Sequence, residues 1–144
     1  MNDGYIQDKL TAVFLSLNDF SGVEYIKRSG EKLLNVDLPN VPFTPPADKR
    51  FFSLSFLPNE PDPSGLGTNA GNTWTGVFQI DIMVPIGAGM AEISAKYDWI
   101  CRLFSRGKTF DEVMILRTYR AAEGPETDFY RTVIRVEFRA DLSK

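Results

Sequence analysis

Apolar residues recur at helical spacing in two stretches of this 144-residue chain. In Asp3–Leu17 and in Ala88–Ser105 they fall three, four or seven residues apart, on one face of a helix. Acid-to-base pairs at i,i+4, such as Glu92 with Lys96, predict a solvated outer side for the second helix. We therefore predict two amphipathic helices that each pack on a sheet. Their apolar stripes are Ile6, Leu10, Val13, Phe14 and Leu17, and then Ile93, Tyr97, Ile100, Cys101 and Phe104.

Four other stretches alternate between apolar and polar residues, which is the period of a half-buried strand. They are Phe51–Leu57, Thr73–Val84, Glu112–Arg120 and Phe129–Ala140, and Val23–Lys27 is a candidate edge strand. The charged outer side of the last strand predicts a sheet face that meets water or a partner. The order of elements favours an α+β fold, with a mostly antiparallel four- or five-stranded sheet and both helices packed on one face.

The segment LPNEPDPSGLGTNAGNTW, from Leu57 to Trp74, interrupts this pattern. It has three prolines, three glycines and three asparagines, and it lies between two strand stretches. Connections longer than about 12–15 residues are uncommon in compact domains unless they are functional or disordered. We expect a single domain over residues 1–144, with a long mobile loop at about residues 58–73.

The composition argues against several kinds of site. The chain has no histidine and one cysteine, Cys101, which excludes His-based catalysis, nucleophilic triads and the usual zinc sites. Cys101 is interpreted as a small buried hydrophobic residue. A net charge of −3 does not suggest nucleic-acid binding. A polar N-terminus and the lack of a long apolar run predict neither a signal peptide nor a membrane span. We expect no metal, no cofactor and a reducing compartment or disulfide-free particle.

Two features resemble parts of enzyme sites. In VPIGAGMAE, Gly87 and Gly89 match the first two glycines of a dinucleotide-binding turn, but Glu92 replaces the third and would repel a pyrophosphate. An ordinary strand-to-helix turn is the preferred interpretation. Asp81 and Glu137 fall on outer sheet faces, where paired carboxylates could serve a glycosidase or bind Mg²⁺. A solvated, salt-bridged sheet surface is preferred for them.

Five motifs taken together point to a known family. They are VPFTPPADKRFFSLSFLPNEP, GLGT, TGVFQIDIMVPIGAGMAEI, FSRG and a final strand that carries Tyr130. With them the chain, from about Asn40 to Ala140, resembles the phage tail terminator (tail completion) family of tailed phages and prophages. The most specific parts are the PFTPP block, the P-x-G-x-G exit of the strand after the loop, and the F-x-RG end of the second helix.

The resemblance implies a structural protein and not an enzyme, because no catalytic motif belongs to this family. It implies a ring, commonly a hexamer, on the end of the tail tube, where it stops tube polymerisation. The partners would be further copies of the chain, the tail tube protein and the head–tail connector protein. The location would be the virion tail, after assembly in the host bacterial cytoplasm.

Within this interpretation the long loop would become ordered by docking on a neighbouring subunit. Leu66 is the one large aliphatic residue inside it and Trp74 closes it, so both are candidate anchors of the interface. Thr68 is a third candidate contact.

Two other classes stay open at this point. One is a small ligand-binding α+β domain with a pocket beneath the long loop. The other is a hydrolase or metal-dependent enzyme that uses Asp81, Glu92 or Glu112. An enzyme predicts convergent carboxylates in a concave site, and a ligand-binding domain predicts an apolar cavity. A ring protein predicts an exposed edge or face that is paired in the assembly.

Overall fold

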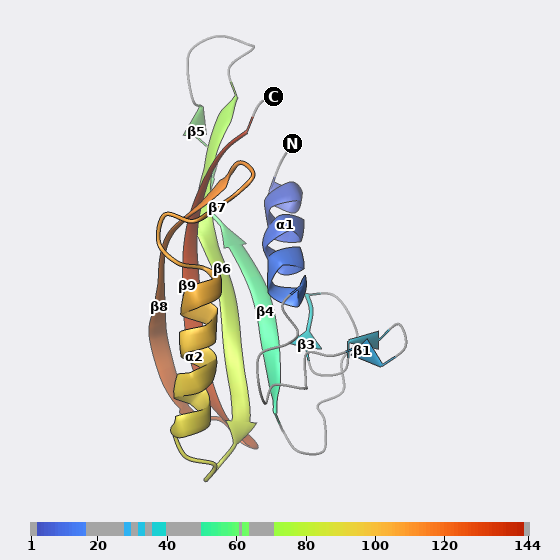
Figure 1. Ribbon diagram of the computed structural model, residues 1–144, viewed down its shortest axis with the longest axis vertical. Coiled ribbons are helices and arrows are strands. Elements are labelled where there is room, and N and C mark those ends of the chain that lie inside the picture. Colours follow the sequence, from blue (N-terminus) through green and yellow to red (C-terminus); the bar gives the residue numbers. More distant parts are fainter. Residues whose placement is uncertain are drawn as a thin grey trace.

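The computed structural model describes residues 3–16, 28–29, 32–33, 36–39, 50–60, 62–63 and 71–142. These residues form two helices, α1 (Asp3–Ser16) and α2 (Ala91–Leu103), and a set of strands (Figure 1). The long strands are β4 (Phe51–Pro58), β6 (Asn72–Pro85), β8 (Val113–Pro125) and β9 (Phe129–Leu142). The two-residue strands are β1 (Arg28–Ser29), β2 (Lys32–Leu33), β3 (Val36–Asp37), β5 (Asp62–Pro63) and β7 (Thr109–Phe110).

Seven of these strands form one sheet in the order β3-β4-β6-β9-β8-β7, with β5 paired to β6. Every pair is antiparallel except β3 with β4. Strands β1 and β2 form a separate two-stranded hairpin. The predicted α+β class with a mostly antiparallel sheet is confirmed, and the extra strands are two-residue pairings too short to give an alternating pattern.

Both helices pack on the same face of the sheet, where the alternating apolar side chains of the long strands point. Figure 1 shows α2 running along the long strands β6, β8 and β9, and α1 beside β4. The two helices meet at an aromatic cluster: the ring centroid of Phe14 lies 5.3 Å from that of Phe52 and 5.5 Å from that of Trp99. The fully buried side chains around it include Ile6, Leu10, Phe78, Ile80, Ile82, Ile93, Ile100, Phe104, Ile134, Val136 and Phe138.

The prediction of a solvated outer side for the second helix is wrong at Lys96, because this side chain is only 1% exposed. Its Nζ donates to Glu92 Oε2 at 2.6 Å and lies 5.6 Å from the centroid of the Phe52 ring. Arg50 Nε, just before β4, donates to the same carboxylate at 2.9 Å. Lys96 therefore belongs to the contact between α2 and β4, because its charge is neutralised locally and its stem packs on an aromatic ring. Cys101 is half-buried, so its predicted burial is only partial.

Two predicted boundaries also shift. Helix α2 begins at Ala91 and not at Ala88, because Gly87 and Gly89 adopt φ values of 91° and 84° that end the preceding strand in a turn. This is the expected plain strand-to-helix turn. The strand predicted over Glu112–Arg120 is longer in the structure, since β8 continues to Pro125 and pairs there with Tyr130.

Gly76 holds β4 close to β6. A Cβ at this position would lie 2.7 Å from the Leu57 carbonyl oxygen and 2.8 Å from the Pro58 Cα. These are backbone atoms that cannot move aside cheaply, so the end of β4 requires a glycine here. Leu17 and the candidate strand Val23–Lys27 lie outside the described residues. Neither described helix is long and apolar enough to cross a membrane.

Candidate functional site

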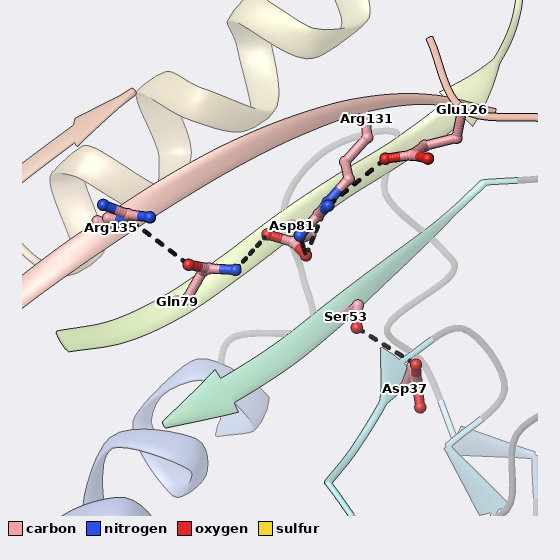
Figure 2. Close-up of polar contacts among 7 residues, drawn as sticks. All are labelled: Asp37, Ser53, Gln79, Asp81, Glu126, Arg131 and Arg135. Atoms are coloured by element: carbon pink, nitrogen blue, oxygen red, sulfur yellow. Dashed lines mark hydrogen bonds and ion pairs between the residues drawn. The ribbon is translucent and has the colours of Figure 1, made fainter. Parts of the chain in front are cut away.

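The sheet face opposite the helices carries a connected row of polar side chains, shown in Figure 2. Arg135 Nε donates to Gln79 Oε1 at 3.4 Å, and Gln79 Nε2 donates to Asp81 Oδ1 at 3.2 Å. Arg131 Nη2 donates to Asp81 Oδ2 at 2.8 Å, and its Nη1 lies 3.5 Å from Glu126 Oε1. We call these five residues the polar row. It joins the middle of β6 to β9 and to the β8–β9 turn.

The strand register explains the row. Gln79 stands opposite Arg135, whereas Arg131 stands opposite Met83 and reaches diagonally to Asp81. Diagonal neighbours on one face are about 7–8 Å apart at Cα, within the reach of an arginine. A separate contact at the edge of the same sheet links Ser53 Oγ of β4 to Asp37 Oδ2 of β3 at 3.2 Å.

Asp81 is more deeply buried than a solvated surface would allow. It is 4% exposed, which contradicts the predicted solvation but agrees with the predicted salt bridge. Burial raises the pKa of Asp81, and the charge and hydrogen bonds of Arg131 oppose this rise without cancelling it. Burial lowers the pKa of Arg131, but the charge of Asp81 outweighs that effect and the pKa rises. The row is therefore a partly desolvated ion pair and not a free acid.

Glu137 fits the expected surface better. Its Oε2 accepts a hydrogen bond of 2.9 Å from Arg117 Nε, and this hydrogen bond lowers the pKa of Glu137. The Arg117 guanidinium also lies 4.5 Å from the centroid of the Tyr119 ring. On the face of β8 and β9 that no helix covers, opposite charges on neighbouring strands therefore neutralise each other.

The three candidate catalytic carboxylates do not converge. Asp81 belongs to the polar row, Glu92 is bound by Lys96 of its own helix, and Glu112 accepts a 2.7 Å hydrogen bond from the Tyr5 hydroxyl. Burial raises the pKa of Glu92, but its hydrogen bonds to Lys96 and Arg50 outweigh burial and the pKa falls. Within the described residues no group of three or more acidic or cysteine side chains could hold a metal ion.

Two hollows on the described surface are small. One, of about 220 Å³, is lined by residues 122–126, at the end of β8 and in the turn after it, with Arg131 and Val133. The other, of about 230 Å³, lies at the β6–α2 turn and is lined by Val84, Pro85, Tyr130 and residues 87–90. Ligand pockets usually enclose roughly 300–1,000 Å³, so neither hollow resembles a small-molecule site.

Of the three predicted interface residues, the structure describes only Trp74. Leu66 and Thr68 lie outside the described residues. Trp74 lies on β6 opposite Ala140, is half-buried, and packs against the core. Its Nε1 is buried and has no hydrogen-bond partner within the described part of the chain. Trp74 is thus partly a core residue beside the base of the loop.

The base of the long loop is held by strand pairing. Asp62 stands opposite Thr73, and Pro63 opposite Asn72. The Asn59 backbone N–H also donates to the Thr75 carbonyl oxygen at 2.9 Å. The segment between residues 63 and 72 therefore starts and ends at neighbouring points of the sheet.

Exposed large apolar side chains mark surfaces that the sequence reasoning did not identify. They occur at the end of β4, in the β6–α2 turn and at the start of β8. Alternation alone could have flagged Leu57, which falls on the polar side of its strand. The residues are Leu57, Ile86, Met90, Met114 and Leu116.

Comparisons with known proteins add an independent line of evidence. The sequence pattern of a family described as "phage tail terminator protein" matches residues 24–138. One solved structure without a descriptive title is similar with a TM-score of 0.63 and 18% identity, covering 94% of this chain and 96% of that chain. A chain from a structure titled "Virion of native gene transfer agent (GTA) particle" is similar with a TM-score of 0.50 and 19% identity, covering 93% of both chains. The search of curated proteins gave no match. At such identities the structural matches support the fold alone.

Proposed function

The chain belongs to the phage tail terminator family, and from this membership we propose that it forms a ring on the end of the tail tube. There it stops tube polymerisation and presents the surface to which the head connector binds. The family is structural and not enzymatic, and its members are components of the virion tail. The finer statements, a ring of about six copies with contacts to tube and connector proteins, are the proposal.

The observation that carries the proposal is the family match over residues 24–138, which includes all four long strands in whole or in large part and all of α2. The chemistry of the described residues agrees with it. The carboxylates that could have served catalysis are each bound to a neighbouring donor, and the described hollows are too small for an ordinary ligand. No observation favours the ligand-binding or the hydrolase alternative.

A ring that stops polymerisation must bind the growing end of the tube. It must also cover the surface to which the next tube subunit would bind. The proposed role of the long loop is to help build this ring by docking on the adjacent copy. Its base is fixed by the β5–β6 pairs, so the loop would project from a defined point of the sheet. Leu66, Thr68 and Trp74 stay the predicted contacts.

The test is the length and completeness of tails made without the protein. In a phage or prophage that carries this gene, its deletion should give tails that are overlong and not joined to heads. Supplying the intact chain in trans should restore uniform, joined tails. If the deleted strain makes tails of normal length that join heads, the proposed function is wrong.

A further inference from the structure

The seven-stranded sheet has two edges, and on each one part of the backbone has no neighbouring strand within the described residues. On one edge, β3 pairs with β4 only at Phe52 and Ser53. On the other, β7 pairs with β8 only at Val113 and Met114, and the preceding turn hydrogen-bonds to Ile115. Within the described residues, no strand pairs with the outer side of β4 beyond Ser53 or of β8 beyond Ile115.

The two open stretches lie at the same level of the sheet. Their residues are linked through consecutive cross-strand pairs, and each such line of paired residues is called a cross-strand row. The pairing of β8 with β9 is irregular at Leu116 and at Ala121, so the regular open stretch of β8 between them is Arg117–Arg120. Followed across β9 and β6, these four residues lie in the rows of Leu54–Leu57 on β4. One such row runs through Leu57, Val77, Glu137 and Arg117.

The strand directions at the two edges are complementary. Strands β4, β6, β9 and β8 alternate in direction because each adjacent pair is antiparallel. With an even number of strands, β4 and β8 run in opposite directions. If two copies are related by rotation about an axis along the strands, β4 of one copy meets β8 of the next as another antiparallel pair.

The side chains at the two edges also suit a contact. Leu57 is 49% exposed at the end of β4, and Leu116 is 37% exposed beside the open stretch of β8. Arg117 and Tyr119 form a stacked pair on that stretch, with the guanidinium held by Glu137. Tyrosine, arginine and exposed aliphatic side chains are typical anchors of protein interfaces. Leu57 and Arg117 lie on the same face, so each could cover the other across the contact.

We propose that neighbouring copies in the ring join their sheets edge to edge, with Leu54–Leu57 of one copy paired antiparallel to Arg117–Arg120 of the next. This inference rests on the proposed ring and names the surface that builds it. A cyclic assembly of more than two copies needs two different, complementary patches on each copy. The two edges of one sheet supply such patches at the same height, and their pairing satisfies backbone groups that an open edge leaves to water.

The test is disulfide cross-linking between substituted positions at the two edges. All variants carry Cys101→Ala, which removes the native thiol of the chain. The test variant combines Leu57→Cys with Arg117→Cys, two positions in one row. Within one copy they are three strand spacings apart, about 14 Å, which is too far for a disulfide. Any disulfide between them must therefore join two copies.

The matched control combines Leu57→Cys with Ala122→Cys. Ala122 is on the same edge and face but stands in the row of Ser53, about 13 Å further along the strand direction. The two single substitutions test for contacts between identical edges. Ring formation is followed separately by electron microscopy and native mass spectrometry, in solution and on isolated tail tubes.

Oxidation of assembled rings should convert the test variant into covalent multimers up to the full ring. The chains of the control and of both single variants should stay mostly without covalent cross-links. Rings without cross-linking in the test variant, or equal cross-linking in the control, would overturn the edge pairing and leave the proposed function intact. If no ring forms in solution or on tubes, both the edge pairing and the proposed function fail.

Discussion

The two faces of the sheet are made by the same four strands and differ in polarity. On the helix-covered face, side chains such as Ile80, Ile134 and Val136 are fully buried in apolar contacts. On the opposite face, Asp81 is nearly as buried, but it is satisfied by an ion pair and a hydrogen bond. Alternation along a strand therefore identifies the core face reliably, whereas it does not tell how far the other face is exposed.

The largest effect is expected on the helix-covered face. Phe14→Ala should remove the ring that joins α1 to Phe52 and Trp99 and leave a cavity there. We expect the free energy of unfolding to fall by about 3–5 kcal/mol in a denaturant melt. Leu57→Ala, at an exposed position of β4, is the matched control and should change the monomer little. Equal losses in the two variants would mean that the core is placed wrongly.

A smaller effect is expected in the polar row. Asp81→Ala leaves Arg131 without its main partner in a partly buried site and should cost about 1–3 kcal/mol of stability. The double variant Asp81→Leu/Arg131→Leu should recover much of this loss, because two apolar groups avoid the desolvation of both charges. A double variant no more stable than Asp81→Ala would show that the polar row is needed for the fold itself.

The pH dependence of stability should distinguish the two faces by sign. The folded pKa of Asp81 is raised, so this residue favours the fold below about pH 3.9, and that contribution is lost as the pH rises through the folded pKa. The folded pKa of Glu92 is lowered, so its contribution is present above about pH 4.3 and is lost as the pH falls through the folded pKa.

Stability measured from pH 2 to 7 should therefore rise more steeply with pH in Asp81→Asn than in the intact chain, and less steeply in Glu92→Gln. Slopes that change in the same direction for both variants would contradict the assigned environments.

The smallest effect on stability is expected in the long loop. Deleting residues 64–71 and closing the gap with a two-residue turn keeps the β5–β6 pairs and should leave a cooperative melt at nearly the same temperature. The same deletion should weaken ring formation, measured by native mass spectrometry, if the loop docks on a neighbour. Intact rings with the shortened loop would remove Leu66 and Thr68 from the interface.

The sequence predicted the fold well where one period dominates. The alternation in Phe51–Leu57 and Phe129–Ala140 placed both strands and their core faces, and the helical stripes gave α1 and α2 within a few residues. Strand β8 was predicted too short, because AAEGP has the composition of a turn and its pairing with β9 depends on a distant segment. Lys96 was misplaced for a similar reason, since its burial depends on Phe52 and Arg50, which are remote in sequence.

The candidate site was harder to predict than the fold. Asp81 was correctly placed on the outer face as a salt-bridged residue, but its burial depends on the diagonal contact with Arg131. Trp74 stays a predicted interface anchor, and its half-burial against the core could not be predicted from the loop composition. The two open sheet edges depend on which strands are neighbours, and no local pattern in the sequence encodes that. The family resemblance therefore contributed the proposed function, and the residues contributed the fold.

Tube growth in vitro tests directly whether this chain stops polymerisation of the tail tube. Purified tail tube protein from the same phage or prophage is polymerised with and without this chain, and tube lengths are measured by electron microscopy. Substoichiometric amounts of the chain should stop elongation, and a ring should be visible at the capped end. Tubes that continue to lengthen with the chain present in excess, and without a ring at their ends, would contradict this role.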